Sequence, residues 1–320
     1  MRRRDFVGRC AGALLVSSTA TPGRVRRIGL VSGDDPEGGV AAFKETLRTM
    51  AYVEGENLVV EAHQARRGTS GVDPVAAAVR GDVELVVVHS LPLALAARAA
   101  NPAMPLVVVT TPGFVSNGFA ETLERPGGNV TGIDELPPGV TVKRLELLKT
   151  AAPSVSRLAL LSTTPGRGGH EAQLAEAQGA AARLGVTVKP YRAATLPELE
   201  QALARIAAEG MDGLMNFQGA LSYVNRQLIV GFAAKHRLPA VYQATMFAVA
   251  GGLMTWAPSL VDQFRSAAWY VDQILKGARP GDLPIRYPSR YYLTLNNTAA
   301  RHLGIAFLPA LLSQADRVLP

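Results

Sequence analysis

The residues of this sequence that could do chemistry are mostly short, neutral and hydrogen-bonding, and they follow apolar runs typical of strands. They are Ser32, Ser90, Thr111, Thr163, Asn216, Gln218 and Gln243. Small molecules bind outside the carboxyl ends of the strands in open α/β sheets, so these side chains stand where a ligand would be held. Asp34 could bind an amino group or belong to a solvated turn, and His89 is more typical of a polar wall residue than of a general base.

Signatures of catalysis do not accompany these residues. The sequence has no G-x-S-x-G elbow, no H-E-x-x-H pair, and no cluster of Asp, Glu and His with metal-ligand spacing. The single cysteine, Cys10, lies in the N-terminal segment, and its removal with a cleaved leader would exclude a thiolate metal site and a cysteine nucleophile. We therefore predict a binding protein that is not an enzyme and carries no cofactor or metal.

The glycine-rich stretch 124–133, ERPGGNVTGI, invites comparison with a phosphate-binding loop. It lacks the Lys and Ser/Thr of a Walker loop, and its glycines do not keep the G-x-G-x-x-G spacing of a dinucleotide site. Asn129 begins a glycosylation acceptor triplet, which has meaning only in a eukaryotic secretory chain. The favoured interpretation is a turn that delivers the chain into a short strand.

Strands and helices alternate regularly from residue 27 onward. Apolar runs predict strands, and stretches with helical spacing of apolar residues separate them. The strands are expected at 28–31, 57–61, 85–88 and 106–109, with helices at 40–50, 72–80 and 93–100. Nearly continuous Val and Leu runs are what strands covered on both faces require, so we predict a parallel sheet between helix layers.

The same alternation restarts after the glycine-rich stretch. Strands are expected at 158–161, 186–190, 213–216 and 239–242, with helices at 140–151, 169–184, 197–209 and 223–236. The sequence thus predicts an α/β protein with two doubly wound, three-layer α/β/α units, and the stretch 124–133 is the crossover between them.

Of the net charge of +7, +3 falls in the first 21 residues, where Arg2, Arg3, Arg4 and Arg9 stand against a single acidic residue, and +4 is spread over the rest. The remaining charge forms no dense basic run, so nucleic-acid binding is not expected. Positive charges followed by a short apolar run predict an export signal over residues 1–23, and Arg3-Arg4-Asp5-Phe6 resembles a twin-arginine motif. The alternative is a frayed basic tail, and a lipid-anchored Cys10 is disfavoured by Arg9 before it.

Several separate motifs, in order, resemble the substrate-binding proteins of ABC importers, in the group that includes tryptophan, tyrosine and phenylalanine binders. Besides ERPGGNVTGI they are YVEGENL at 52–58, GGLM at 251–254, YVDQILKGARPGDLP at 270–284 and the tail 296–319. The resemblance implies a type I periplasmic-binding fold with two lobes, a multi-strand hinge and a ligand in the cleft between them. The lobes would comprise residues 24–132 with 256–283, and 133–255 with 284–320.

Departures from the family pattern bear on the ligand. Many relatives have Asp-Pro where this chain has Gly113-Phe114, and Ser-Tyr-Gly where it has Thr255-Trp256-Ala257. Losing the Asp would remove a partner for a ligand's ammonium group. Phe114 and Trp256 would either add apolar surface to the cleft or be ordinary core aromatics. The sequence therefore favours a small, largely apolar ligand, aromatic or carboxylate-bearing.

The resemblance also implies the protein's partners and location. A monomer in the periplasm would deliver its ligand to a membrane permease and its ATPase. A ligand-sensing module that feeds a sensor kinase or regulator would share the same sequence features, and an enzyme on this fold is the more distant alternative.

Overall fold

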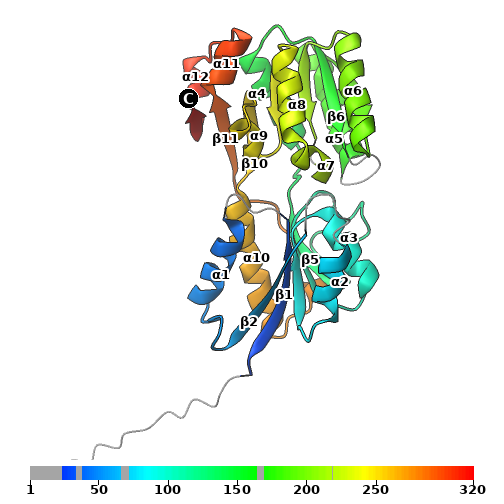
Figure 1. Ribbon diagram of the computed structural model, residues 1–320, viewed down its shortest axis with the longest axis vertical. Helices are drawn as coiled ribbons and strands as arrows, with labels where there is room; N and C mark the ends of the chain where they lie inside the picture. Colours follow the sequence, from blue (N-terminus) through cyan, green and yellow to red (C-terminus); the bar gives the residue numbers. More distant parts are fainter. Residues whose placement is uncertain (1–23, 34–37, 66–71, 164–168, 218) are drawn as a thin grey trace, which may run out of the picture.

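The computed structural model describes residues 24–33, 38–65, 72–163, 169–217 and 219–320. They form two α/β lobes, one above the other in Figure 1, which the chain connects by several crossings. Asp34 and Gln218 lie outside the described residues. Within the described ranges, no helix has the length and apolar character needed to cross a membrane.

The first lobe contains a parallel sheet of order β2-β1-β3-β4-β5. Its central strands are Val- and Leu-rich and buried along their whole length, because helices cover both faces. The strands are β1 (Arg26–Ser32), β2 (Leu58–Gln64), β3 (Leu85–Val88), β4 (Leu106–Thr111) and β5 (Val130–Asp134).

Helices α1 (Gly39–Thr49) and α10 (Leu260–Leu275) pack together on one face of this sheet. Helices α2 (Val72–Arg80) and α3 (Leu91–Ala100) cover the other face. A side chain at Gly39 would place its Cβ 2.3 Å from the ring of Phe264, so glycine permits the close approach of α1 to α10.

The second lobe contains a seven-stranded sheet of order β12-β11-β10-β9-β8-β6-β7, parallel except where β11 runs against β10. Its strands are β6 (Arg157–Ser162), β7 (Thr187–Arg192), β8 (Gly213–Asn216), β9 (Ala240–Tyr242), β10 (Met254–Pro258), β11 (Tyr291–Asn296) and β12 (Arg317–Leu319).

Two apolar clusters, one on each face, hold the helices of the second lobe against its sheet. The side chain of Thr195 caps α6 by accepting from the N–H of Glu198, whose carboxylate in turn accepts from the N–H of Ala194. The helices are α4 (Val140–Ala151), α5 (His170–Ala181), α6 (Leu196–Ala208), α7 (Ala220–Val224), α8 (Arg226–Lys235), α9 (Thr245–Val249), α11 (Asn297–Leu303) and α12 (Pro309–Leu312). Two short 3₁₀ turns complete the elements, Ala182–Leu184 in this lobe and Pro280–Asp282 in the first.

The chain passes between the lobes three times. The first crossing follows β5 and leads into α4, the second lies between β10 and α10, and the third precedes β11. The first and third run side by side, since Ile133 pairs with Arg286. Strand β10 belongs to the second sheet as far as Pro258, so the second crossing comes at Ser259, slightly later than the predicted boundary at residue 256.

Candidate functional site

The predicted polar side chains of the first lobe lie at the carboxyl ends of adjacent strands. Ser32 ends β1, His89 follows β3 and Thr111 ends β4, and these ends point towards the second lobe (Figure 1). The hydroxyl of Thr111 is fully buried and has no hydrogen-bond partner among the described residues. The half-buried ring of His89 lies 5.5 Å from that of Phe264 between centroids.

Ser90, at the start of α3, has an unusual backbone conformation. Its φ is 125°, where residues other than glycine are rarely found. Such a conformation costs about 1–3 kcal/mol and persists only when its surroundings enforce it, which is most common at functional sites. The strain therefore supports Ser90 as a site residue independently of its polarity.

The loop at Gly113 and Phe114 is tied to the first crossing by Asp134, a residue that sequence reasoning missed. One carboxylate oxygen of Asp134 accepts from the N–H groups of Gly113 at 3.0 Å and Phe114 at 3.1 Å, and the other accepts from Leu136 at 3.1 Å. Burial raises the pKa of Asp134, while these N–H groups oppose the shift. The carboxylate is thus already occupied by the backbone.

The side chain of Phe114 lies in the core of the first lobe. It is 0% exposed and packs edge-on against Phe119, with 6.1 Å between ring centroids. Of the two interpretations of Phe114, the structure therefore supports the core aromatic. The ring is buried among apolar residues and presents no surface to a ligand.

Gly113 is also where the two lobes approach each other closely. A Cβ built on it would lie 3.1 Å from the backbone nitrogen of Gly169, the residue before α5 in the second lobe. The φ of Gly113 is 71°, so both the turn and the contact favour glycine here.

In the second lobe, Thr163 and Asn216 are joined through Ser222 of α7, which sequence reasoning also missed. The Thr163 and Ser222 hydroxyls are 2.7 Å apart, and the amide nitrogen of Asn216 donates to Ser222 at 3.0 Å. All three side chains are buried. The amide oxygens of Asn216 and of the buried Gln243 have no hydrogen-bond partner within the described part of the chain.

Trp256 belongs to a cluster next to the crossings, in which side chains of β10, β11 and α4 meet the backbone of the first crossing. Its ring stacks on Tyr291 with 5.8 Å between centroids, and the hydroxyl of Tyr291 donates to the carbonyl of Glu135 at 2.5 Å. The Nε of Arg144, in α4, donates to the carbonyl of Trp256 at 2.9 Å. Trp256 and Tyr291 are half-buried, so this cluster, unlike Phe114, keeps some apolar surface exposed.

Arg144 carries a buried positive charge at this cluster. Its side chain has one hydrogen bond to the described residues, through Nε, although a guanidinium has five N–H donors. Burial lowers the pKa of Arg144 to about 10, against the electrostatic effects of Tyr291, Glu135 and Glu176. Arg144 therefore stays protonated at neutral pH and retains unused donors.

Comparison with known proteins identifies the family. A model of the family described as ABC transporter substrate binding protein matches residues 25–319. This chain belongs to that family. The predicted family and the predicted two-lobed α/β fold are both confirmed.

Individual proteins that resemble this chain are distant in sequence. The tyrosine-binding protein of Clostridioides difficile (strain R20291) is 22% identical over 270 residues, which cover 84% of this chain and 77% of that protein. The Streptococcus pneumonia ABC domain solved in complex with L-Trp is 21% identical, covers 92% of this chain and 99% of its own, and gives a TM-score of 0.83. A conserved domain protein from Vibrio cholerae is 23% identical, with coverages of 92% and 100% and a TM-score of 0.82.

Proposed function

We propose that this protein captures a small ligand between its two lobes as the extracytoplasmic substrate-binding protein of an ABC importer. The observation that carries the proposal is the set of buried polar atoms at the facing strand ends that have no hydrogen-bond partner among the described residues, Thr111 in one lobe and Asn216 and Gln243 in the other. An unpaired buried polar group costs about 1–3 kcal/mol, and a ligand that pairs with it removes this cost.

Groups from both lobes are needed for capture to drive closure. A ligand shifts a conformational equilibrium only as far as it binds one state better than the other. A molecule held by Thr111 and also by Asn216 or Gln243 contacts both lobes only when they are together, so its binding favours the closed form. The three crossings would then act as the hinge.

The ligand that these groups fit best is a small aromatic carboxylic acid. Trp256 and Tyr291 offer half-buried aromatic surface, and Arg144 beside them has unused donors for a carboxylate. Because Asp134 is bound by three backbone N–H groups, it is a poor partner for an ammonium group. L-Trp in the pneumococcal structure and tyrosine, for which the clostridial relative is named, share the aromatic ring and the carboxylate.

The partners and location follow from the family. An importer's substrate-binding protein works outside the cytoplasmic membrane and delivers its ligand to a permease driven by an ATPase. We propose this arrangement here, with residues 1–23 as the export signal; those residues lie outside the described structure.

Thermal unfolding with a ligand panel tests the proposal. The panel contains aromatic amino acids, the matching aromatic acids without an ammonium group, and the amides of both. A ligand at a hundred times its dissociation constant stabilises the protein by about 2.7 kcal/mol, which is readable in a melt. We expect acids to stabilise the protein more than their amides.

Small-angle scattering on the same samples separates capture from surface binding. A ligand held between the lobes should reduce the radius of gyration, while one bound to a single lobe should not. Stabilisation without compaction, or conversion of the ligand to a product, would contradict the proposal.

A further inference from the structure

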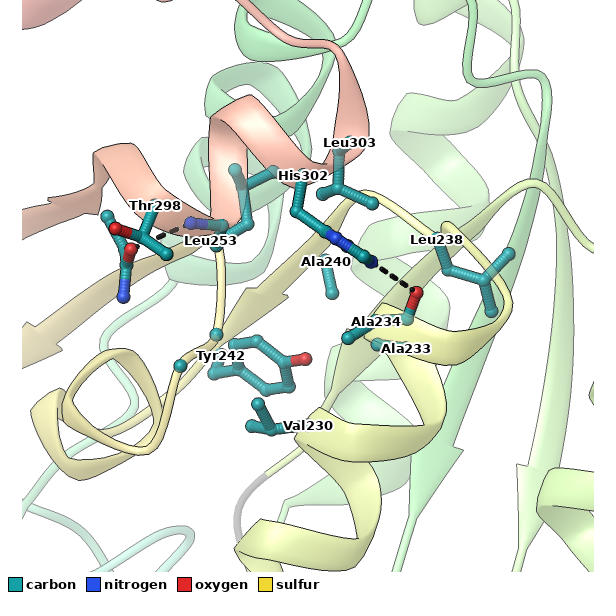
Figure 2. A pocket seen from close by; sticks show the side chains of 14 residues that line it. Val230, Ala233, Ala234, Leu238, Ala240, Tyr242, Leu253, Thr298, His302 and Leu303 are labelled. Atoms are coloured by element: carbon teal, nitrogen blue, oxygen red, sulfur yellow. Dashed lines mark hydrogen bonds between the residues drawn. The ribbon is translucent and has the colours of Figure 1, made fainter.

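A hollow lies entirely within the second lobe. It has a volume of about 250 Å³ and lies between α8, α11, strand β9 and the turn that precedes β10. Figure 2 shows apolar side chains on most sides of it, including Val230, Leu238 and Leu303. His302 and Thr298, both exposed, stand at its rim.

One polar group inside this hollow has no hydrogen-bond partner in the described part of the chain. The side chain of Tyr242 is 0% exposed, and its hydroxyl makes no hydrogen bond to any described residue. Figure 2 shows the hydroxyl pointing across the hollow towards Ala233 and Ala234. Burial raises the pKa of Tyr242, so the hydroxyl keeps its proton and remains a donor at neutral pH. Its ring is held from behind by stacking on Phe247 at 4.9 Å between centroids.

The hollow is a consequence of small residues at its walls. A Cβ on Gly252 would lie 2.6 Å from the ring of Tyr242, and Gly251 has a φ of 105° that favours glycine. Ala234 faces the hollow from α8, and Ala299 faces it from α11. Larger residues at these positions would fill the hollow, so the glycine and alanine residues keep it open.

We propose that this hollow binds a small, neutral aromatic molecule that carries one hydrogen-bonding group, which pairs with the hydroxyl of Tyr242. A dry apolar cavity of about 150 Å³ holds a benzene ring, so the larger volume here suits a fused two-ring molecule. The mostly apolar lining disfavours a charged ligand, because it contains no Lys, Arg, Asp or Glu side chain that would compensate an ion. The single unpaired hydroxyl selects a molecule with one matching polar group.

This site is independent of ligand capture between the lobes. Every residue that lines it belongs to the second lobe, so its occupant makes the same contacts whether the lobes are together or apart. Such a ligand stabilises the second lobe and leaves the equilibrium between open and closed forms unchanged.

Titration of the purified protein with 2-naphthol and with naphthalene tests the proposal. The two probes differ only in the hydroxyl that would pair with Tyr242. We expect both to shift the methyl resonances of Val230, Leu238 and Leu303, with 2-naphthol binding about threefold to tenfold more tightly, the factor expected from one neutral hydrogen bond. The radius of gyration should stay constant.

Two variants decide what the shifts mean. Tyr242→Phe should keep the binding of both probes and abolish the preference for 2-naphthol. Ala234→Leu, which places a larger side chain in the hollow, should abolish binding of both. The proposal is overturned if the shifts persist in Ala234→Leu, or if Tyr242→Phe still prefers 2-naphthol to naphthalene. It is also overturned if neither probe binds and Tyr242→Phe only stabilises the fold, which is the result expected for a water-filled hollow.

Discussion

Buried polar groups with unused hydrogen-bonding capacity occur in two regions, at the boundary between the two lobes and in the hollow inside the second lobe. The two regions differ in which parts of the chain supply these groups. At the boundary they come from both sheets and from α4, with Thr111, Asn216 and Arg144 as examples. In the hollow, among the residues that the structure describes, the one such group is Tyr242, within a single lobe. A ligand at the boundary can therefore bring the lobes together, and a ligand in the hollow cannot.

Polar groups without hydrogen-bond partners therefore do not by themselves make a transport site. A transport site needs contacts that differ between the open and closed forms. A partner that recognises one of these forms responds only to interactions that change between them. The following predictions test whether the two regions are separate in this sense.

The largest effect is expected from Arg144→Gln. Loss of hydrogen bonds to a charged group costs about 1.5–3 kcal/mol, so affinity for a carboxylate ligand should fall about tenfold to a hundredfold. Titration calorimetry with an aromatic acid and its amide measures this, and the amide should be nearly unaffected. Lys143→Gln removes the same charge one residue earlier in α4 and serves as the control. Equal losses for acid and amide would show that Arg144 supports the hinge and does not bind the carboxylate.

Gly113→Ala should weaken ligand binding about tenfold, because its Cβ would lie 2.4 Å from the Oγ of Ser116 and 3.1 Å from the backbone nitrogen of Gly169, so the loop must shift where it meets the other lobe. Gly118→Ala is the matched control: Gly118 has a similar φ of 69°, but the nearest atom to its Cβ is the end of the Arg98 side chain at 3.8 Å. Both variants should lose about 1–2 kcal/mol of stability from the left-handed backbone. If both lose the same affinity, lobe contact at Gly113 is not part of closure.

Tyr291→Phe removes the hydrogen bond from the third crossing to the carbonyl of Glu135 in the first. The hinge should become less well ordered, and ligand affinity should fall about threefold to tenfold, as for one neutral hydrogen bond. Tyr191→Phe removes a tyrosine hydrogen bond to Glu209 within the second lobe and should change stability alone. Calorimetry measures the ligand affinity of both variants, and thermal melts measure their stability. Equal ligand affinities for Tyr291→Phe and Tyr191→Phe would contradict the hinge role.

The smallest effect on the boundary is expected from Ala234→Leu. Filling part of the hollow should change the affinity for the inter-lobe ligand by less than about twofold, because every residue that lines it belongs to the second lobe. Stability should rise by about 0.5–2 kcal/mol if the leucine fits without strain. A change of affinity well beyond twofold would show that the two regions are coupled.

The fold could be predicted from the sequence because its elements are locally encoded. Val86, Val87 and Val88 form a run that only a strand buried on both faces accommodates, and the structure has them in β3. Prediction was poorer where tertiary contacts set the element. The single helix expected over 223–236 is two in the structure, because α7 ends at Val224, with Ser222 bonded to Thr163 and Asn216, and α8 begins at Arg226.

The candidate site could be predicted in part. Thr111, Thr163, Asn216 and Gln243 were found because strand ends are visible in the sequence, and the structure brings them to the facing edges of the two sheets. Whether they bind a ligand stays a prediction. Asp134 and Glu135 were missed, although two adjacent acids directly after a crossing strand are a signal that could have been read.

The two α/β units, the strand ends that could hold a ligand and the family can be recognised from local patterns, because periodicity, turn residues and motifs are properties of neighbouring residues. The placement of Phe114 in the core and of Trp256 against Tyr291 depends instead on the folded arrangement of the lobes. The same arrangement brings Arg144 to Trp256, and Tyr291 to Glu135, across more than a hundred residues of chain. No local pattern encodes such pairs, since they exist only once both sheets have folded and the three crossings lie side by side.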